Sequence, residues 1–167
     1  TRSLMSDTPV EYTPIGTIHT DFETAEGMPI QPTVAGDATG VVAFDAEFEL
    51  ALSDLDGFSH CILLYHFHGS DGDHSPTVTP FLDESERGLF ATRAPKRPNN
   101  IGLSVVAIES IDGTELTVSG IDVVDGTPLL DVKPFVPEFD IPQNTESGWI
   151  ADSDDGTGRT RADSRFL

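Results

Sequence analysis

Short apolar or alternating stretches, separated by turn residues, run through most of the first 137 positions of the chain. This pattern is typical of β-strands. It predicts strands at residues 15–19, 41–44, 61–67, 89–92, 103–111, 115–124 and 129–132. Asp112-Gly113 is a strong hairpin signal between two of these strands, and Asp125-Gly126 predicts a second turn.

One segment has a different period. Phe48, Leu52 and Leu55 recur at helical spacing and Gly57 follows them, so residues 46–55 are predicted to form a short helix. Many short strands with one or two short helices favour an all-β or α+β barrel over alternating β-α-β units.

The pattern also divides the chain. Residues 1–13 are expected to form a flexible N-terminal arm, residues 14–140 one barrel domain, and residues 141–167 an acidic, partly flexible tail whose candidate anchors are Trp149 and Phe166-Leu167. No run of 18 apolar residues is present, so no membrane-spanning helix is expected. The single cysteine, Cys61, lies in an apolar run and is expected to be a buried structural thiol in a reducing cytoplasm.

Charge changes the picture of the surface. Twenty-nine acidic residues against nine basic ones give a net charge of −20. Such a surface repels itself and nucleic acid in dilute buffer, but at about 1 M salt the screening length falls to about 3 Å. The composition therefore favours a cytoplasmic protein of a halophile, in which net charge alone does not exclude an RNA partner.

Four of the nine basic residues, Arg87, Arg93, Lys96 and Arg97, fall within eleven positions. Prolines restrict the backbone of residues 94–100, which makes this a stiff loop that displays cationic donors. The cluster predicts a site for an anionic ligand; the alternative is a loop that neutralises nearby carboxylates.

Two further sets of residues carry chemistry. His66 and His68, with His74 close behind, could bind one metal ion in a metal-dependent hydrolase, although such histidines more often line a polar cleft. Asp131 and Lys133 share one face of a strand, where they could act as a base and its electrostatic partner or form a structural ion pair.

In the basic loop and the Asp-x-Lys-Pro run, the chain resembles the TsaA/TrmO family of tRNA methyltransferases, of an archaeal, halophilic type. The resemblance extends over roughly residues 15–140. Its matching segments are residues 15–18, 27–32, 55–60, 65–68, 89–104 and 125–134.

The resemblance implies a small non-Rossmann β-barrel that binds S-adenosylmethionine, forms a homodimer and needs no metal. The absence of a GxGxxG motif agrees with this. The implied activity is methylation of the exocyclic amine of threonylcarbamoyl-adenosine beside the anticodon of a threonine tRNA. The implied cofactor residues are Gln31, Pro32, His68, Gly69, Arg93, Leu103 and a strand formed by Ser119, Gly120, Ile121 and Asp122. The implied reaction centre is Asp131 with Lys133, and Lys96, Arg97 and Asn99 are expected to contact RNA.

Some positions depart from the family pattern. Asn100 stands where a second proline is usual, which is expected to loosen the loop, and Phe135 replaces a tyrosine. The sequence also ends before the C-terminal domain of bacterial members, so its hold on tRNA is expected to differ. A module that binds S-adenosylmethionine without transferring methyl is the main alternative.

Overall fold

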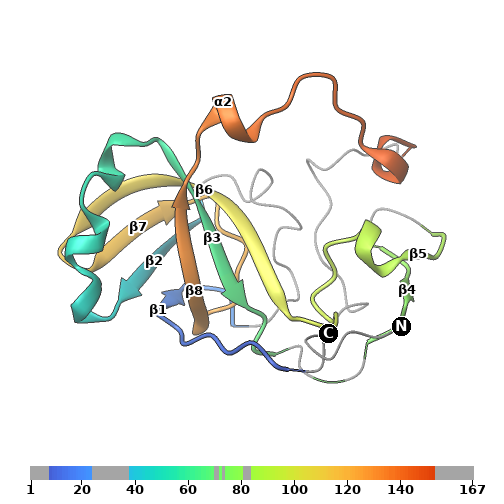
Figure 1. The fold of residues 1–167 in the computed structure, drawn as a ribbon, viewed down its shortest axis with the longest axis horizontal. Coiled ribbons are helices and arrows are strands. Elements are labelled where there is room, and N and C mark those ends of the chain that lie inside the picture. Colours follow the sequence, from blue (N-terminus) through green and yellow to red (C-terminus); the bar gives the residue numbers. More distant parts are fainter. Residues whose placement is uncertain (1–7, 24–37, 70–71, 73, 81–83, 153–167) are drawn as a thin grey trace.

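Six antiparallel strands close into one barrel (Figure 1). The structure, a computed structural model, describes residues 8–23, 38–69, 72, 74–80 and 84–152. The barrel order is β1-β2-β7-β6-β3-β8. Its strands are β1 (Gly16–His19), β2 (Thr39–Phe44), β3 (His60–His66), β6 (Ile101–Asp112), β7 (Glu115–Ser119) and β8 (Thr127–Pro134). The prediction of a mainly β, barrel-shaped protein is confirmed.

The remaining elements are short. A two-stranded sheet pairs β4 (Thr77–Val78) with β5 (Arg87–Gly88). Single helical turns are η2 (Ala46–Phe48), η3 (Leu50–Leu52), η4 (Leu55–Gly57), η5 (Leu89–Ala91), α2 (Pro137–Asp140) and η6 (Gly148–Asp152). No helix in the described part of the chain is long and apolar enough to cross a membrane.

Alternate residues of each strand fill the barrel, because side chains of a strand point to opposite faces in turn. The core includes Ile18, Val42, Leu63, Leu116 and Leu129, all without solvent exposure. Cys61 lies among them as predicted, and desolvation by burial raises the pKa of its thiol to about 12. A thiol in that environment stays protonated and is not a nucleophile.

The predicted helix at 46–55 is wrong in type, although its apolar residues are buried as expected. Phe48 and Leu55 pack against the core and Leu52 belongs to it. The backbone forms three successive 3-10 turns, and Asp54, with φ of 71°, interrupts them. Helix formation is cooperative and needs length, so this short segment between β2 and β3 gains more from placing three side chains on the barrel than from a regular helix.

Two predicted strands and the position of one turn need correction. Residues 89–92, expected to be a strand, form the helical turn η5 instead. The strand expected at 115–124 ends at Ser119, because Gly120 adopts φ of 78° and turns the chain. The hairpin between β6 and β7 is confirmed, but Asp112 pairs with Glu115, so its turn residues are Gly113 and Thr114.

The strand ends define where a site can form. The antiparallel pairing places the last residues of β1, β3 and β7 at one end of the barrel. The first residues of β2, β6 and β8 lie at the same end. Residues 20–38, 67–100 and 120–126 connect the strands there, and we call this the loop end. Figure 1 shows β4, β5 and η5 beside it, and η6 reached by a long connection from α2.

Candidate functional site

The loop end collects most of the residues expected to bind a cofactor, although they are far apart in sequence. His68, Gly69 and Arg93 belong to the connection between β3 and β6, and Gly120 to Asp122 to the connection between β7 and β8. Gln31 and Pro32 belong to the connection between β1 and β2 but lie outside the described residues.

A chain of hydroxyl and carboxyl groups runs from inside the barrel to this end. The Tyr65 hydroxyl and the Ser104 Oγ atom are 2.8 Å apart, and the Ser104 hydroxyl donates to Asp122 Oδ1 at 2.7 Å. Tyr65 and Ser104 are buried, and Asp122 is partly exposed. Because Ser104 has one proton and gives it to Asp122, the Tyr65 hydroxyl is the donor to Ser104. Two buried hydroxyls thus hold one carboxylate.

The surroundings make Asp122 an unusual carboxyl group. Desolvation by burial raises its pKa from 3.8 to about 6, although the Ser104 hydrogen bond, a backbone hydrogen bond and the Arg93 charge all act to lower it. Burial likewise raises the pKa of the Tyr65 phenol, and the Asp122 charge raises it further. Perturbed groups of this kind cluster at functional sites.

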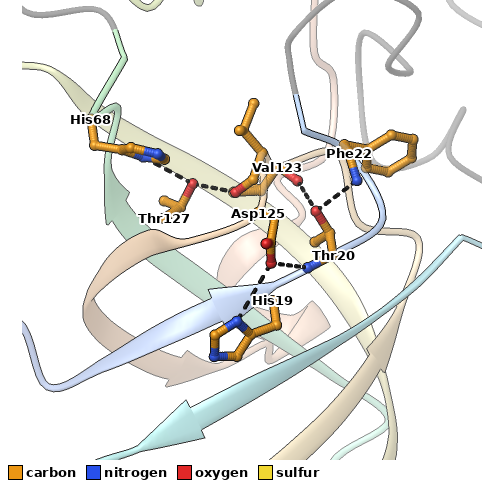
Figure 2. A network of polar contacts seen from close by, with 8 residues as sticks. His19, Thr20, Phe22, His68, Val123, Asp125 and Thr127 are labelled. Atoms are coloured by element: carbon orange, nitrogen blue, oxygen red, sulfur yellow. Dashed lines mark hydrogen bonds and ion pairs between the residues drawn. The ribbon is translucent and has the colours of Figure 1, made fainter.

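The connection that carries Asp122 is fixed to β1 by a polar network (Figure 2). The Thr20 hydroxyl donates to the Val123 carbonyl at 2.7 Å, and the Thr20 amide donates to Asp125 Oδ1 at 3.0 Å. Asp125 Oδ1 also lies 3.4 Å from His19 Nδ1, and the Asp125 amide donates to the Phe22 carbonyl at 2.6 Å. The predicted turn at Asp125-Gly126 is confirmed, and it is held on both sides.

His68 lies at the same network. The buried Thr127 hydroxyl donates to the Val124 carbonyl at 2.6 Å, and its oxygen lies 3.4 Å from His68 Nδ1 (Figure 2). Since the only hydroxyl proton of Thr127 points at Val124, a hydrogen bond with His68 needs Nδ1–H as the donor. A neutral His68 therefore offers its Nε2 lone pair to a ligand.

The other predicted members of this set differ in what they can offer. Ser119 donates to Glu109 Oε1 at 2.5 Å on the outer wall. The amides of Gly120 and Ile121 both donate to the Ala38 carbonyl, and the Ile121 side chain is in the core. Gly69 is exposed at the loop end. Within this group, Asp122 is the member whose side chain offers a charged group.

Asp131 and Lys133 lie elsewhere, on the outer wall of β8. Lys133 Nζ is 3.0 Å from Asp131 Oδ2, and the Val132 amide donates to Asp131 Oδ1 at 2.9 Å. The ladder with β3 pairs Tyr65 with Leu129 but Leu64 with Asp131, so Leu130 is an extra residue, a β-bulge. Beyond the bulge the inward and outward positions exchange, so Val132 packs on the core and Asp131 faces out.

Leu103 lies near the start of β6, between the loop end and the pair formed by Asp131 and Lys133. It is 44% exposed on the outer face of β6 and pairs with Leu64, which pairs with Asp131 on its other side. Adjacent strands are about 4.8 Å apart, so Leu103 and Asp131 are separated by about 10 Å. The outer face of β3 and β6 is apolar here, with the side chains of Ile62, Leu64, Ile101, Leu103 and Val105.

The basic loop is well ordered by its own contacts. Lys96 and Asn99 are exposed, whereas Arg97 Nη1 donates to the carbonyls of Thr92 and Ala94, both at 3.0 Å. Asn100 was expected to loosen the loop, but its Nδ2 donates to the Pro95 carbonyl at 2.8 Å and closes it. Arg97 is thus partly committed to holding the loop that presents Lys96 and Arg93.

The three histidines of the metal hypothesis do not form a ligand set. Among the described residues, no group of three or more His, Cys, Asp or Glu side chains is placed to hold a metal ion. β3 ends at His66, so His68 lies in a turn and does not continue the face that His66 occupies.

Sequence reasoning missed Tyr65, Ser104 and Thr127 as site residues. All three are buried polar groups, and each follows the inward register of a strand. Ser104 lies two residues before the apolar Val106 and therefore on the same, inward face of its strand. Because polar groups inside a core must be hydrogen-bonded, this position could have predicted a buried polar contact.

Comparison with known proteins identifies the family of this chain. Residues 17–141 match the model of the tRNA-methyltransferase O N-terminal domain. A probable S-adenosyl-L-methionine-binding protein of Pyrococcus abyssi is 44% identical over 156 residues, which are 93% of this chain and 84% of that protein. The tRNA (adenine(37)-N6)-methyltransferase of Rattus norvegicus is 35% identical over 139 residues, 80% of this chain.

Solved structures agree in fold. A crystal structure of TrmO superposes with a TM-score of 0.74 and 38% identity over 85% of this chain, and TrmO from Pseudomonas aeruginosa with 0.71 and 37% over 84%. The matched part is 64% and 62% of those two chains, and only 32% of the rat enzyme. The chain therefore spans less than two thirds of these methyltransferases.

Proposed function

The chain belongs to the tRNA-methyltransferase O N-terminal domain family, and we propose that it uses S-adenosylmethionine to methylate the exocyclic amine of an adenosine beside the anticodon of a tRNA. The preferred substrate in this proposal is threonylcarbamoyl-adenosine. The observation that carries it is the loop end, where two connections far apart in sequence, residues 67–100 and 120–126, bring His68, Arg93 and Asp122 to one end of a barrel of the TrmO type.

The chemistry of these residues fits the cofactor. Arg93 is exposed and suits a carboxylate, Asp122 suits an ammonium group, and the half-exposed Leu103 suits an adenine face. When bound, S-adenosylmethionine supplies an electrophilic methyl group. The protein contributes position and electrostatics, and Ser104 holds the Asp122 carboxylate in one orientation.

In this proposal Asp131 and Lys133 act on the amine of the substrate. Both Asp131 oxygens are occupied, one by the Val132 amide and one by the Lys133 ammonium group, which fixes the carboxylate on the outer wall. Side chains of the two residues are 46% and 61% exposed, and an ion pair so exposed adds only about 0–1 kcal/mol to stability. Asp131 is therefore assigned to accept or orient the amine proton, and Lys96, Arg97 and Asn99 to contact RNA.

We further propose that the active form is a homodimer. The outer face of β3 and β6 carries five apolar side chains where a closed barrel in water would carry polar ones, and Ile101 and Leu103 are 45% and 44% exposed. A second copy on this face would lie beside Asp131. Light scattering of the wild type and of Val105→Glu tests this, with a dimer expected for the former and a monomer for the latter.

The acidic surface supports action in a cytoplasm of high salt. Repulsion among so many carboxylates becomes local when the screening length is about 3 Å, at about 1 M salt. Under these conditions contacts with RNA depend on the few basic groups beside the loop end and less on net charge.

The central test is product analysis. The protein is incubated with S-adenosylmethionine and tRNA that carries threonylcarbamoyl-adenosine, and the nucleosides are analysed by mass spectrometry. One added methyl on that nucleoside is expected, and none on tRNA with unmodified adenosine at the same position. Cofactor binding without product would favour a binding module, and loss of activity with a chelator would favour the metal-dependent hydrolase.

A further inference from the structure

The turn η5 carries an exposed aromatic ring beside a fixed guanidinium group. Phe90 is 79% exposed, and Arg97 Cζ lies 5.9 Å from the centroid of its ring. Because Arg97 Nη1 donates to two loop carbonyls, this guanidinium is held by the backbone, and no carboxylate of the described residues pairs with it. The turn therefore presents an exposed ring with a guanidinium group beside it that the backbone already holds.

A second aromatic contact supports the same turn from the C-terminal side. Trp149 Nε1 donates to the Ala91 carbonyl at 2.8 Å, and Arg87 Cζ lies 5.9 Å from the Trp149 ring centroid. η6 therefore lies against η5, as Figure 1 shows at the end of the chain connection from α2. A residue 58 positions further along the chain thus contacts η5 at Ala91, the residue that follows Phe90.

The charge around Phe90 separates it from other exposed rings. Phe139 in α2 is exposed to a similar degree, 83%, but its chain neighbours are Glu138 and Asp140. Phe90 belongs to the segment that holds four of the nine basic residues of a chain with net charge −20. Exposed aromatic groups interleaved with arginines suit the flat faces and phosphates of single-stranded nucleic acid.

We propose that Phe90 and Arg97 form a stacking surface for an unpaired base of the RNA substrate, beside the nucleotide that is methylated. This rests on the proposed function and adds to it a site that reads RNA by stacking. Stacking tolerates any base, so this surface supplies affinity and position, not sequence choice. Trp149 holds η5 in place through its hydrogen bond to the Ala91 carbonyl.

The test measures binding of a fluorescein-labelled anticodon stem-loop RNA by anisotropy at about 0.1 M and about 1 M potassium chloride. Phe90→Ala should bind about 10-fold more weakly or worse, by the same factor at both salt concentrations, because no charge is removed. Phe90→Tyr should restore binding, and Phe139→Ala should match the wild type. Arg97→Ala should instead lower the salt dependence itself.

Controls separate this proposal from the function on which it rests. Both phenylalanines are exposed, so melting temperature and S-adenosylmethionine affinity should be unchanged in either alanine variant. In the wild type, quenching of the emission of Trp149, the only tryptophan, on addition of RNA would report binding at the same surface.

The outcomes are distinct. If tRNA is methylated and Phe90→Ala binds RNA and shows a KM like Phe139→Ala, the stacking surface is wrong and the function stands. If no methyl is transferred but RNA binding still depends on Phe90, the stacking surface stands and the function is wrong. Absence of RNA binding by the wild type, or protein binding there instead, overturns the stacking surface.

Discussion

Gly102 lies directly opposite Tyr65 across the β3–β6 ladder, and a Cβ atom at Gly102 would lie 2.6 Å from Tyr65 Cζ. The same atom would lie 2.8 Å from Phe67 Cζ, and the two rings already pack edge to face at 5.4 Å. The missing side chain of Gly102 is therefore what lets the Tyr65 hydroxyl reach Ser104.

Gly102→Ala should destabilise the protein by about 1–3 kcal/mol, since rings enclosed by a barrel cannot move away from an added methyl group without strain. Urea unfolding measures this. Gly57→Ala is the control, because a methyl group added there would meet nothing within 4 Å, and it should stay within about 0.5 kcal/mol of the wild type. Equal stability of the two variants would mean that Tyr65 is free to shift.

The raised pKa of Asp122 predicts a pH-dependent stability. Burial raises this pKa to about 6 from 3.8, so between about pH 4 and pH 6 the folded protein binds more protons than the unfolded chain. Its contribution to stability is present at low pH and is lost as pH rises to about 6. The difference in free energy of unfolding between the wild type and Asp122→Asn should change across this pH window. The contributions of the other carboxylates are the same in both proteins and cancel in that difference. A difference independent of pH would contradict the raised pKa.

Asp131→Asn should lower turnover about 10²–10⁴-fold if the carboxylate accepts a proton. Asparagine keeps the shape and the acceptor for the Val132 amide, so affinity for S-adenosylmethionine should not change. Single-turnover methylation with a separate binding titration measures the two effects, and Glu138→Gln is a control for an exposed carboxylate. Normal turnover would make Asp131 only the structural partner of Lys133.

Melting temperature should rise steadily with potassium chloride up to molar concentration. The screening length falls from about 10 Å at 0.1 M to about 3 Å at 1 M, which weakens repulsion among 29 acidic residues. A thermal melt at each salt concentration tests this. A flat curve would remove the argument for a high-salt cytoplasm.

Hydrophobic pattern predicted the barrel well because alternation reports directly which side chains face the core. It did not predict backbone form at 46–55, where spacing correctly marked Phe48, Leu52 and Leu55 as buried but could not tell a helix from three 3-10 turns. The spacing of apolar residues reflects which side chains are buried. Whether the backbone forms α-helical or 3-10 hydrogen bonds depends on the length of the segment and on the cooperativity of helix formation.

The candidate site was predictable only in part. The ion pair of Asp131 and Lys133 follows from residues two apart on a strand, and it is observed. Contact among Tyr65, Ser104 and Asp122 depends on strand register and on Gly120 ending β7, because 39 and 18 residues separate the partners. No local pattern contains that information.

Because of the bulge at Leu130, the simple alternation of inward and outward side chains does not hold along the whole of β8. Leu129 and Asp131 are two apart, and in a regular strand they would share the inner face, yet only Leu129 faces the core. If Leu130 paired regularly at unchanged length, Asp131 would turn into the barrel and Val132 toward the solvent. Two relatives can therefore share every letter of the Asp-x-Lys-Pro run and hold its carboxylate on opposite sides of the wall, depending only on whether their strand carries the bulge.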